Sequence, residues 1–240
     1  MTCLSRLFSY LSETQWSYRL SGNQVRVSSG GSLTVGAGVR MRRCNIFVGN
    51  DAEVHIGENA VLSDTDIYIY KGNLSIGNHA ILCGSPLCLL VEDGQVEIGH
   101  HTKVACEKLW VRFGGQLTVG NYTNINAGTE VRCDEKVLIG NYCQISYNIR
   151  IWDTNTHTIY SPEVRAELTR NYFPYFGKET ERPRTSPVII EDYCWMGERS
   201  AILKGTHIAE GVIVGFGTLI CGKSIEKGRT VVAKSSLLIF

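Results

Sequence analysis

Apolar residues recur along this chain with a regular spacing. An aliphatic residue followed by glycine recurs at six regularly spaced positions in the first 140 residues, where successive glycines lie 21, 20, 22, 21 and 20 positions apart. Between the pairs, short extended segments alternate with small or polar turn residues, which is typical of a repeated strand-and-turn unit. The six pairs are Val35-Gly36, Ile56-Gly57, Ile76-Gly77, Ile98-Gly99, Val119-Gly120 and Ile139-Gly140.

After position 187 the spacing shortens to six residues. Each hexad reads as a short strand and a turn, with its first aliphatic residue inward and glycine or asparagine at corners that other residues avoid. Three hexads make one turn of a coil, and the earlier units add two to four residues at its corners. Stacked turns share a core that one turn cannot form alone. The spacing predicts an all-β parallel β-helix of three-strand rungs, of either hand. The hexads begin at Ile190, Met196, Ile202, Ile208 and Val214.

The repeat also predicts columns of equivalent residues on successive turns. Aromatic residues follow the repeated glycine by two positions, which predicts a stack of rings along one corner. A second predicted column contains Arg112, Arg132 and Arg150, spaced by 20 and 18 residues. This arginine column is interpreted either as a solvated face or as a rail for an acidic acceptor. The aromatic column contains His79, His101, Tyr122 and Tyr142, and Tyr193 joins it if Glu191 replaces the glycine.

The first 22 residues form a separate segment. They contain no sustained apolar run, so we expect neither a secretory signal nor a membrane span. Their apolar residues fit one face of a short N-terminal helix, which we expect to cap the coil; a peripheral membrane contact is the less favoured alternative. The predicted division is a cap segment at 1–22 and a β-helix domain at 23–240. The apolar residues of the helix are Leu4, Leu7, Phe8 and Leu11.

Composition narrows the class of protein. The chain has 240 residues, is 43% apolar and carries a net charge of +1, so nothing points to nucleic acid or to a charged membrane. Its nine cysteines are odd in number and form no CxxC pair. We interpret them as reduced, small apolar residues of a protein in a reducing compartment, the cytoplasm.

The repeat stops between residues 152 and 186. The segment "IWDTNTHTIYSP", residues 151–162, opens this inserted loop and places a single histidine, His157, at the break. Loops of this length in compact folds are usually functional or disordered. A histidine off the regular coil is free to face a cleft. His157 is therefore the first candidate for a chemical role.

Two stretches resemble a known family. "SPVIIEDYCWMGERSAILKGTHIAEGVIVGFGTLICGKS" is similar to the hexapeptide-repeat acyltransferases, which fold as left-handed β-helices. "LIGNYCQISYNIRIWDTNTHTIYSP" is similar to the branch that O-acetylates capsular, lipopolysaccharide and sialic-acid sugars. The resemblance implies a left-handed parallel β-helix. The matching residues are Pro187, Ile190, Asp192, Trp195, Gly197, Ile202, Leu203, Lys204, Gly205, Ile208, Val214, Gly215 and Gly217.

The resemblance implies acetyl transfer from acetyl-CoA to a sugar hydroxyl. His157 matches the family's general base, and a neutral imidazole suits that role near physiological pH. Trp195 matches a tryptophan that lies beside the histidine across a subunit boundary, and its indole N–H is expected to stabilise the oxyanion or to pack against pantetheine. Asp153, Asn155 or a backbone carbonyl is expected to hold the imidazole tautomer, with Asp153 favoured.

The same resemblance implies where acetyl-CoA and the acceptor bind. Pantetheine is expected to lie along the coil beside Trp195, where three glycines without side chains leave room for it. Two lysines are expected to contact the phosphates of the coenzyme. The coenzyme residues are Gly197, Lys204, Gly205, Gly215 and Lys223. Candidate acceptor contacts are Arg132, Arg150, Asn155 and Tyr160, with Arg165, Arg182 and Arg184 as weaker candidates. No metal is expected, because His79, His101 and His157 lack ligand spacing.

The leading prediction is a cytoplasmic O-acetyltransferase acting on a surface polysaccharide or its precursor. It is expected to be a homotrimer with sites between subunits and with no nucleic-acid partner. One alternative is an N-acetyltransferase of a nucleotide-linked amino sugar, which the same base would serve. Another is a non-catalytic β-helix scaffold that binds glycans and needs neither His157 nor Trp195. A metal-dependent hydratase is disfavoured by the histidine spacing.

Overall fold

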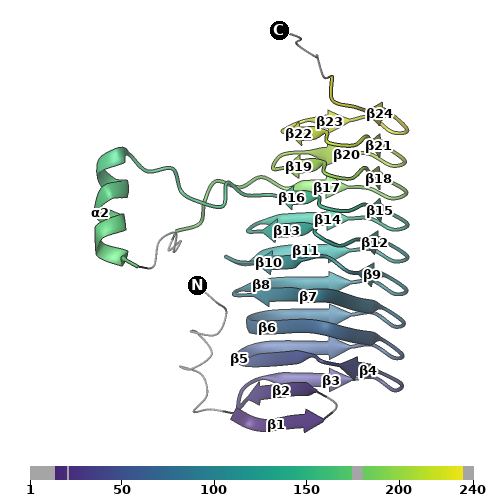
Figure 1. Cartoon of the computed structure of the whole chain (residues 1–240), viewed down its shortest axis with the longest axis vertical. Helices are drawn as coiled ribbons and strands as arrows, with labels where there is room; N and C mark the ends of the chain where they lie inside the picture. The colour runs from purple at the N-terminus through teal and green to yellow at the C-terminus, as the bar shows by residue number, and fades with distance from the viewer. Residues whose placement is uncertain (1–13, 21, 175–180, 235–240) are drawn as a thin grey trace.

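The computed structural model describes residues 14–20, 22–174 and 181–234. These residues wind into a parallel β-solenoid of about ten turns, with one helix in an inserted loop (Figure 1). Strands of successive turns pair in parallel, so that a residue faces its equivalents one turn before and one turn after, as in Leu117 with Val96 and Val137. The parallel β-helix predicted from the spacing is therefore confirmed.

Each turn contributes to three faces, which we call A, B and C in chain order. Face A contains β2 (Asn23–Ser28), β10 (Lys108–Val111), β13 (Glu130–Cys133), β16 (Arg150–Trp152), β19 (Ala201–Leu203) and β22 (Leu219–Cys221). Face B contains β3 (Ser32–Val35), β8 (Gly94–Ile98), β11 (Gly115–Val119), β14 (Lys136–Ile139), β17 (Val188–Ile190), β20 (His207–Ile208) and β23 (Ser224–Ile225). Face C contains β4 (Arg40–Arg42), β9 (Lys103–Val104), β12 (Asn124–Ile125), β15 (Gln144–Ile145), β18 (Trp195–Met196), β21 (Ile213–Val214) and β24 (Thr230–Val231).

Three long strands bend around the corners near the N-terminal end. β5 (Asn45–Ile56) passes from face A to face B, β6 (Val61–Ile76) covers faces C, A and B, and β7 (Ile81–Val91) passes from C to A. β1 (Thr14–Leu20) pairs antiparallel with β2 and covers the edge of the first turn. The helix predicted at Leu4–Leu11 lies outside the described residues. The described part of the predicted cap is thus a strand.

The core is made of stacked inward aliphatic side chains. On face A alone, one inward residue per turn forms an unbroken column, and each member is at most 4% exposed. Full burial of each such side chain contributes roughly 1.5–3 kcal/mol, but only because the turns above and below cover it. The face A column is Val25, Ile46, Ile67, Leu89, Leu109, Val131, Ile151, Ile202 and Ile220.

The B–C corner explains the repeated aliphatic–glycine pair. A Cβ added at Gly77 would lie 2.7 Å from the backbone of the next turn, at Gly99 C and His100 N. The close approach of successive turns therefore requires glycine at this corner. The repeat pattern predicts glycine at the corners for its left-handed conformation, but Gly77 does not have a positive φ. The left-handed residue comes two positions later, at φ 58° in His79.

That later position carries the predicted aromatic stack, which is confirmed. Five rings follow one another at centroid separations of 4.7, 4.9, 5.2 and 5.2 Å. The backbone φ angles of these five residues lie between 54° and 59°. Such values are uncommon for residues with a Cβ, so ring stacking and a backbone hydrogen bond to the preceding turn must hold them. The members are His79, His101, Tyr122, Tyr142 and Tyr193.

The predicted arginine column is wrong. Arg132 lies in register with Trp110 and Trp152, and Arg150 lies in register with Glu130. The turns here run from residue 110 to 132 and from 132 to 152, so they hold 22 and 20 residues, whereas the arginines are spaced by 20 and 18. Each arginine is therefore displaced by two residues from the last.

The inserted loop leaves the coil at the A–B corner, between β16 and β17. Its two arms pair where they leave: Thr154 bridges Thr185, and the Asn155 N–H donates to the Arg184 carbonyl at 3.0 Å. Further out, α2 (Pro162–Tyr172) begins after an N-cap at Ser161, and none of its residues is buried. Figure 1 shows α2 standing to the left of the coil.

Two of the loop's aromatic residues are exposed in the single chain. Tyr172 and Phe173 are 43% and 71% exposed in the single chain. Tyr160 is half-buried, whereas Tyr175 and Phe176 lie outside the described residues. These two residues are exposed because α2 projects away from the coil, where no described part of the chain covers it.

Candidate active site

His157 is exposed on the outgoing arm of the loop, five residues after β16 ends. The pairing of the two arms fixes this arm at the A–B corner. Two backbone hydrogen bonds make up this pairing, because the Ser186 N–H also donates to the Asp153 carbonyl, at 2.9 Å. The candidate base is thus presented at the start of a long loop whose root is hydrogen-bonded to the coil.

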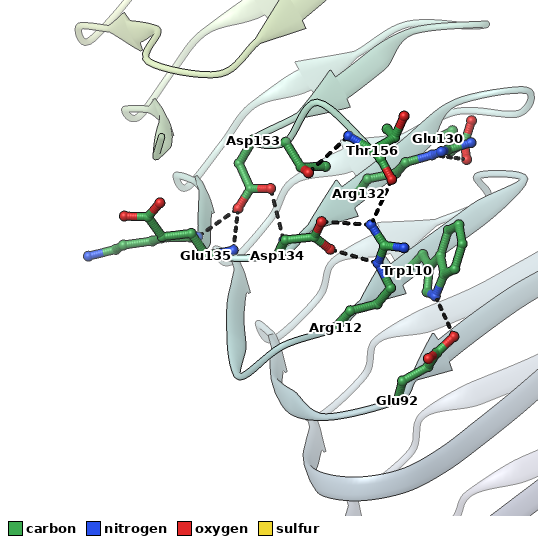
Figure 2. Close-up of polar contacts among 11 residues, drawn as sticks. Glu92, Trp110, Arg112, Glu130, Arg132, Asp134, Glu135, Asp153 and Thr156 are labelled. Carbon is green, nitrogen blue, oxygen red and sulfur yellow. Dashed lines mark hydrogen bonds and ion pairs between the residues drawn. The ribbon is translucent and has the colours of Figure 1, made fainter. Parts of the chain in front are cut away.

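Asp153 lies beneath this arm and is fully buried. One carboxylate oxygen accepts the backbone N–H of Asp134 at 2.9 Å, and the other accepts those of Glu135 and Lys136, each at 2.7 Å (Figure 2). Burial raises the pKa of the Asp153 carboxyl, and the three N–H donors act in the opposite direction. These bonds tie the loop to the turn between β13 and β14. We therefore assign Asp153 to holding that turn and do not carry forward its predicted role at the imidazole.

The turn held by Asp153 contains a buried ion pair. Asp134 receives two hydrogen bonds from Arg112, from Nε at 2.8 Å and from Nη2 at 2.7 Å, and the two side chains are 0% and 7% exposed. Arg112 Nη2 also donates to the Thr156 carbonyl at 3.4 Å, across 44 residues of sequence. Figure 2 shows these contacts as a series: Asp153 binds the backbone N–H of Asp134, the Asp134 carboxylate binds Arg112, and Arg112 binds the Thr156 carbonyl. From the sequence, we placed Arg112 in a surface column, interpreted as a solvated face or as a rail for an acidic acceptor, and overlooked Asp134.

Removal of the Asp153 carboxylate is expected to destabilise the fold. Asp153→Ala leaves three backbone N–H groups without this acceptor, at roughly 1–3 kcal/mol for each that stays unsatisfied. Thermal or denaturant unfolding should therefore show a lower free energy of unfolding, with Asp153→Asn intermediate because its amide keeps one acceptor oxygen. Asp93→Ala is the control, since Asp93 is 43% exposed in a 3.2 Å pair with Lys71 and surface pairs contribute little. Equal effects at the two positions would contradict the assignment of Asp153.

Face A carries an aromatic and cationic patch close to the loop. The Arg132 guanidinium lies 5.3 Å from the Trp110 ring and 4.5 Å from the Trp152 ring. Glu130 pairs with Arg132 at 2.7 Å and with Arg150 at 3.7 Å, so their charges are partly compensated. The patch of Trp110, Glu130, Arg132, Arg150 and Trp152 brings two predicted acceptor contacts together. In this part of the described chain the two arginines therefore do not form an uncompensated row of positive charges.

The other two predicted acceptor contacts lie in the loop. Asn155 is half-buried and belongs to the paired arms. The Tyr160 hydroxyl donates to Glu181 at 3.5 Å, which joins the two sides of the loop. Both residues flank His157 along the chain. A contact with an acceptor remains a prediction for each.

Trp195 is on face C, half exposed, in β18. Its indole N–H donates to the Ser146 hydroxyl at 3.2 Å. Ser146 was not among the predicted site residues, although it follows the cysteine of the quoted "CQIS" segment by three positions. One turn separates the two, since Gln144 and Ile145 pair with Trp195 and Met196. Ser146 therefore sets the direction in which the indole N–H points.

The coil places His157 and Trp195 on opposite sides. In a three-sided coil the A–B corner lies opposite face C, and Figure 1 shows the loop on the left and β18 on the right edge. The predicted coenzyme residues divide in the same way. Trp195 lies on face C with Gly197 and Gly215 directly after its strands, whereas Lys204, Gly205 and Lys223 lie at the A–B corner. One chain alone does not bring the predicted site together.

Packing accounts for one of the predicted coenzyme glycines. Gly197 is buried, and a Cβ there would lie 2.7 Å from the Val214 carbonyl oxygen of the next turn. The described residues gather no group of three histidine, cysteine or acidic side chains suited to a metal ion. Within the same residues, no helix is long and apolar enough to cross a membrane.

Comparison with known proteins supports the family resemblance. No protein-family model matches the sequence. The bifunctional protein GlmU of Ralstonia nicotianae is 22% identical over 191 residues, which cover 73% of this chain and 37% of GlmU. WbbJ of Escherichia coli K12, named for O-acetyl transfer in lipopolysaccharide biosynthesis, is 24% identical over 147 residues, 61% of this chain and 71% of WbbJ. This chain thus spans little more than a third of GlmU.

A solved structure has the same fold. The polysialic-acid-specific acetyltransferase NeuO aligns with a TM-score of 0.50 and 16% identity, over 92% of this chain and 87% of that chain. At this identity the likeness is one of fold. The sequence matches and the solenoid agree with the repeat pattern and with the resemblance seen in "CWMGERSAILKG". The chain therefore has a parallel β-solenoid that matches a left-handed β-helix, and this fold fits the hexapeptide-repeat acyltransferases that its sequence resembles.

Proposed function

We propose that this protein is an acetyl-CoA-dependent O-acetyltransferase acting on a sugar hydroxyl of a surface polysaccharide or its precursor. The observation that carries the proposal is the exposed His157 at the hydrogen-bonded root of the loop, on a fold shared with sugar acyltransferases. His157 removes the proton from the attacking hydroxyl. Such general-base catalysis typically contributes about 10²–10⁴-fold.

The residues around the A–B corner fit an acyl-CoA. Lys204 and Lys223 stand at this corner on successive turns, because the Gly222 N–H donates to the Lys204 carbonyl at 3.1 Å. Two ammonium groups there suit the phosphates of the coenzyme. Acetyl-CoA supplies an activated thioester, so no covalent nucleophile of the protein is needed. Burial and backbone packing of Cys143 and Cys194 support leaving them out of the chemistry.

A second copy of the chain completes the site in this proposal. The loop and its histidine lie at the corner opposite face C, so Trp195 of one chain and His157 of another are the pair that meets. A closed homotrimer in the cytoplasm provides three equivalent meetings of this kind. There, the Trp195 indole N–H exchanges its Ser146 partner for the developing oxyanion, or its ring packs against pantetheine.

The patch on face A supports contact with a sugar. Aromatic faces and partly compensated charges suit a polyhydroxylated ring, through stacking and hydrogen bonds, better than a purely anionic group. Arg132 and Arg150 already share Glu130, which leaves donors on each guanidinium for acceptor hydroxyls or carboxylates. Asn155 and Tyr160 extend this surface toward His157.

The test is acyl transfer by the purified protein. Release of free CoA from acetyl-CoA is followed with monosaccharides, nucleotide sugars and anionic polysaccharides as acceptors. An O-acetyl product is cleaved by mild alkali and supports the proposal. An alkali-stable amide would instead favour N-acetylation of an amino sugar. Glycan binding with no acceptor-dependent CoA release would favour a non-catalytic scaffold.

A further inference from the structure

We infer that Arg112 is a positioning residue for His157. Its guanidinium holds the Thr156 carbonyl and so sets the direction of the peptide that carries the histidine. The inference rests on the proposed function, since it assigns Arg112 a task in that reaction. It replaces direct support of the imidazole by Asp153 with support of the backbone on which the imidazole is mounted.

The first step is that Arg112 cannot move. It is 6% exposed, two of its nitrogens bind Asp134, and its guanidinium lies 4.4 Å from the Trp110 ring and 5.1 Å from the Phe113 ring. Because Nε and Nη2 are both held by Asp134, the planar guanidinium has a fixed orientation, and the second N–H of Nη2 points in one direction. That N–H meets the carbonyl of Thr156.

The second step is that Thr156 needs such support. Its φ is 65°, the left-handed region, which is a genuine outlier for a β-branched residue. A conformation of this kind costs about 1–3 kcal/mol and persists only where its surroundings hold it. Two contacts do so here: the Thr156 N–H donates to Thr154 Oγ1 at 3.0 Å, and the carbonyl accepts from Arg112.

The third step links these contacts to the coil. Asp153 binds three N–H groups of the β13–β14 turn, Asp134 in that turn binds Arg112, and Arg112 binds Thr156. All three ionised side chains are nearly or fully buried. The position of residue 157 therefore follows from the packing of the coil as well as from the exposed loop.

The test uses two changes of the buried pair in the full-length protein. Arg112→Lys keeps a positive charge beside Asp134, but the lysine ammonium lacks the planar fork that binds both Asp134 and the Thr156 carbonyl. The double change Arg112→Met with Asp134→Leu removes both charges, which buried ion pairs often tolerate without loss of stability. The second variant keeps the test decisive if the first does not fold. The matched control is Arg43→Met with Asp64→Leu, a two-bond Arg–Asp pair near the N-terminal end of the coil.

Two measurements separate positioning from general stability. In folded variants kcat is expected to fall about 10²-fold, the effect of a misplacement near 1 Å, while KM for acetyl-CoA stays unchanged. Amide hydrogen exchange should become faster at residues 154–158 and stay unchanged in the distant turns. The control pair should alter neither measurement at the loop.

The contrary results are distinct. Wild-type kcat in a folded Arg112 variant overturns the inference, and so does unchanged exchange at 154–158. Acyl transfer by the wild type that does not depend on His157, or no acyl transfer with any acceptor, overturns the proposed function and the inference with it. Loss of kcat in the control pair to the same extent would also overturn the inference, because the effect would then be general.

Discussion

His157→Ala is expected to reduce acyl transfer by about 10²–10⁴-fold, the usual contribution of a general base. The reason is that the acceptor hydroxyl cannot lose its proton during attack, although the thioester remains activated. kcat should carry the loss, whereas binding of acetyl-CoA and the oligomeric state should be nearly unchanged. Steady-state kinetics, with coenzyme binding measured by calorimetry, check both parts.

The exposed position of His157 makes this test clean. The side chain is exposed and lies off the coil, so its removal opens no cavity in the core and should leave the coil folded. His55→Ala is the matched control, since His55 is an exposed histidine of β5 on face B, many turns from the loop. Retained turnover in His157→Ala would sink the assignment of the base. An equal loss in His55→Ala would show that the effect is not specific to the loop.

Several features of the coil could be predicted because they depend on the number of residues between equivalent positions of successive turns. The aromatic stack was counted from the repeated glycine, and that glycine stays at the B–C corner whatever the length of the turn. The arginine column was counted between the arginines themselves. Each spacing is two residues shorter than the turn that it spans, so each arginine is displaced by two positions, as the pairing of Arg132 with Trp110 shows.

The support of the site was harder to predict for a physical reason. Asp153 binds backbone N–H groups, and a backbone partner leaves no trace in the identity of residues 134–136. The Arg112–Asp134 pair was within reach, since its spacing of 22 residues equals the local length of a turn. The helix at Pro162–Tyr172 was also marked, by a serine N-cap followed by proline at the first helical position.

Oligomers that mix two inactive variants are expected to recover acyl transfer. His157→Ala and Trp195→Ala are each expected to be nearly inactive alone, yet oligomers containing both variants should recover activity. This outcome follows from the proposed shared site. The A–B corner and face C are on opposite sides of one chain, so in that proposal His157 and Trp195 of a working site come from different chains. In a random mixture at equal amounts, about a quarter of the sites combine an intact histidine with an intact tryptophan.

Co-expression with two different affinity tags, followed by sequential purification on both, isolates the mixed oligomers for kinetic measurement. Oligomers of two differently tagged His157→Ala chains are the control and should stay inactive. The recovered sites should show the KM of the wild type, since each is chemically complete, with only their number reduced. Folded mixed oligomers without recovered activity would contradict a site shared between chains. Full activity of Trp195→Ala alone would remove Trp195 from the site, and with it the chemical reason for a second chain.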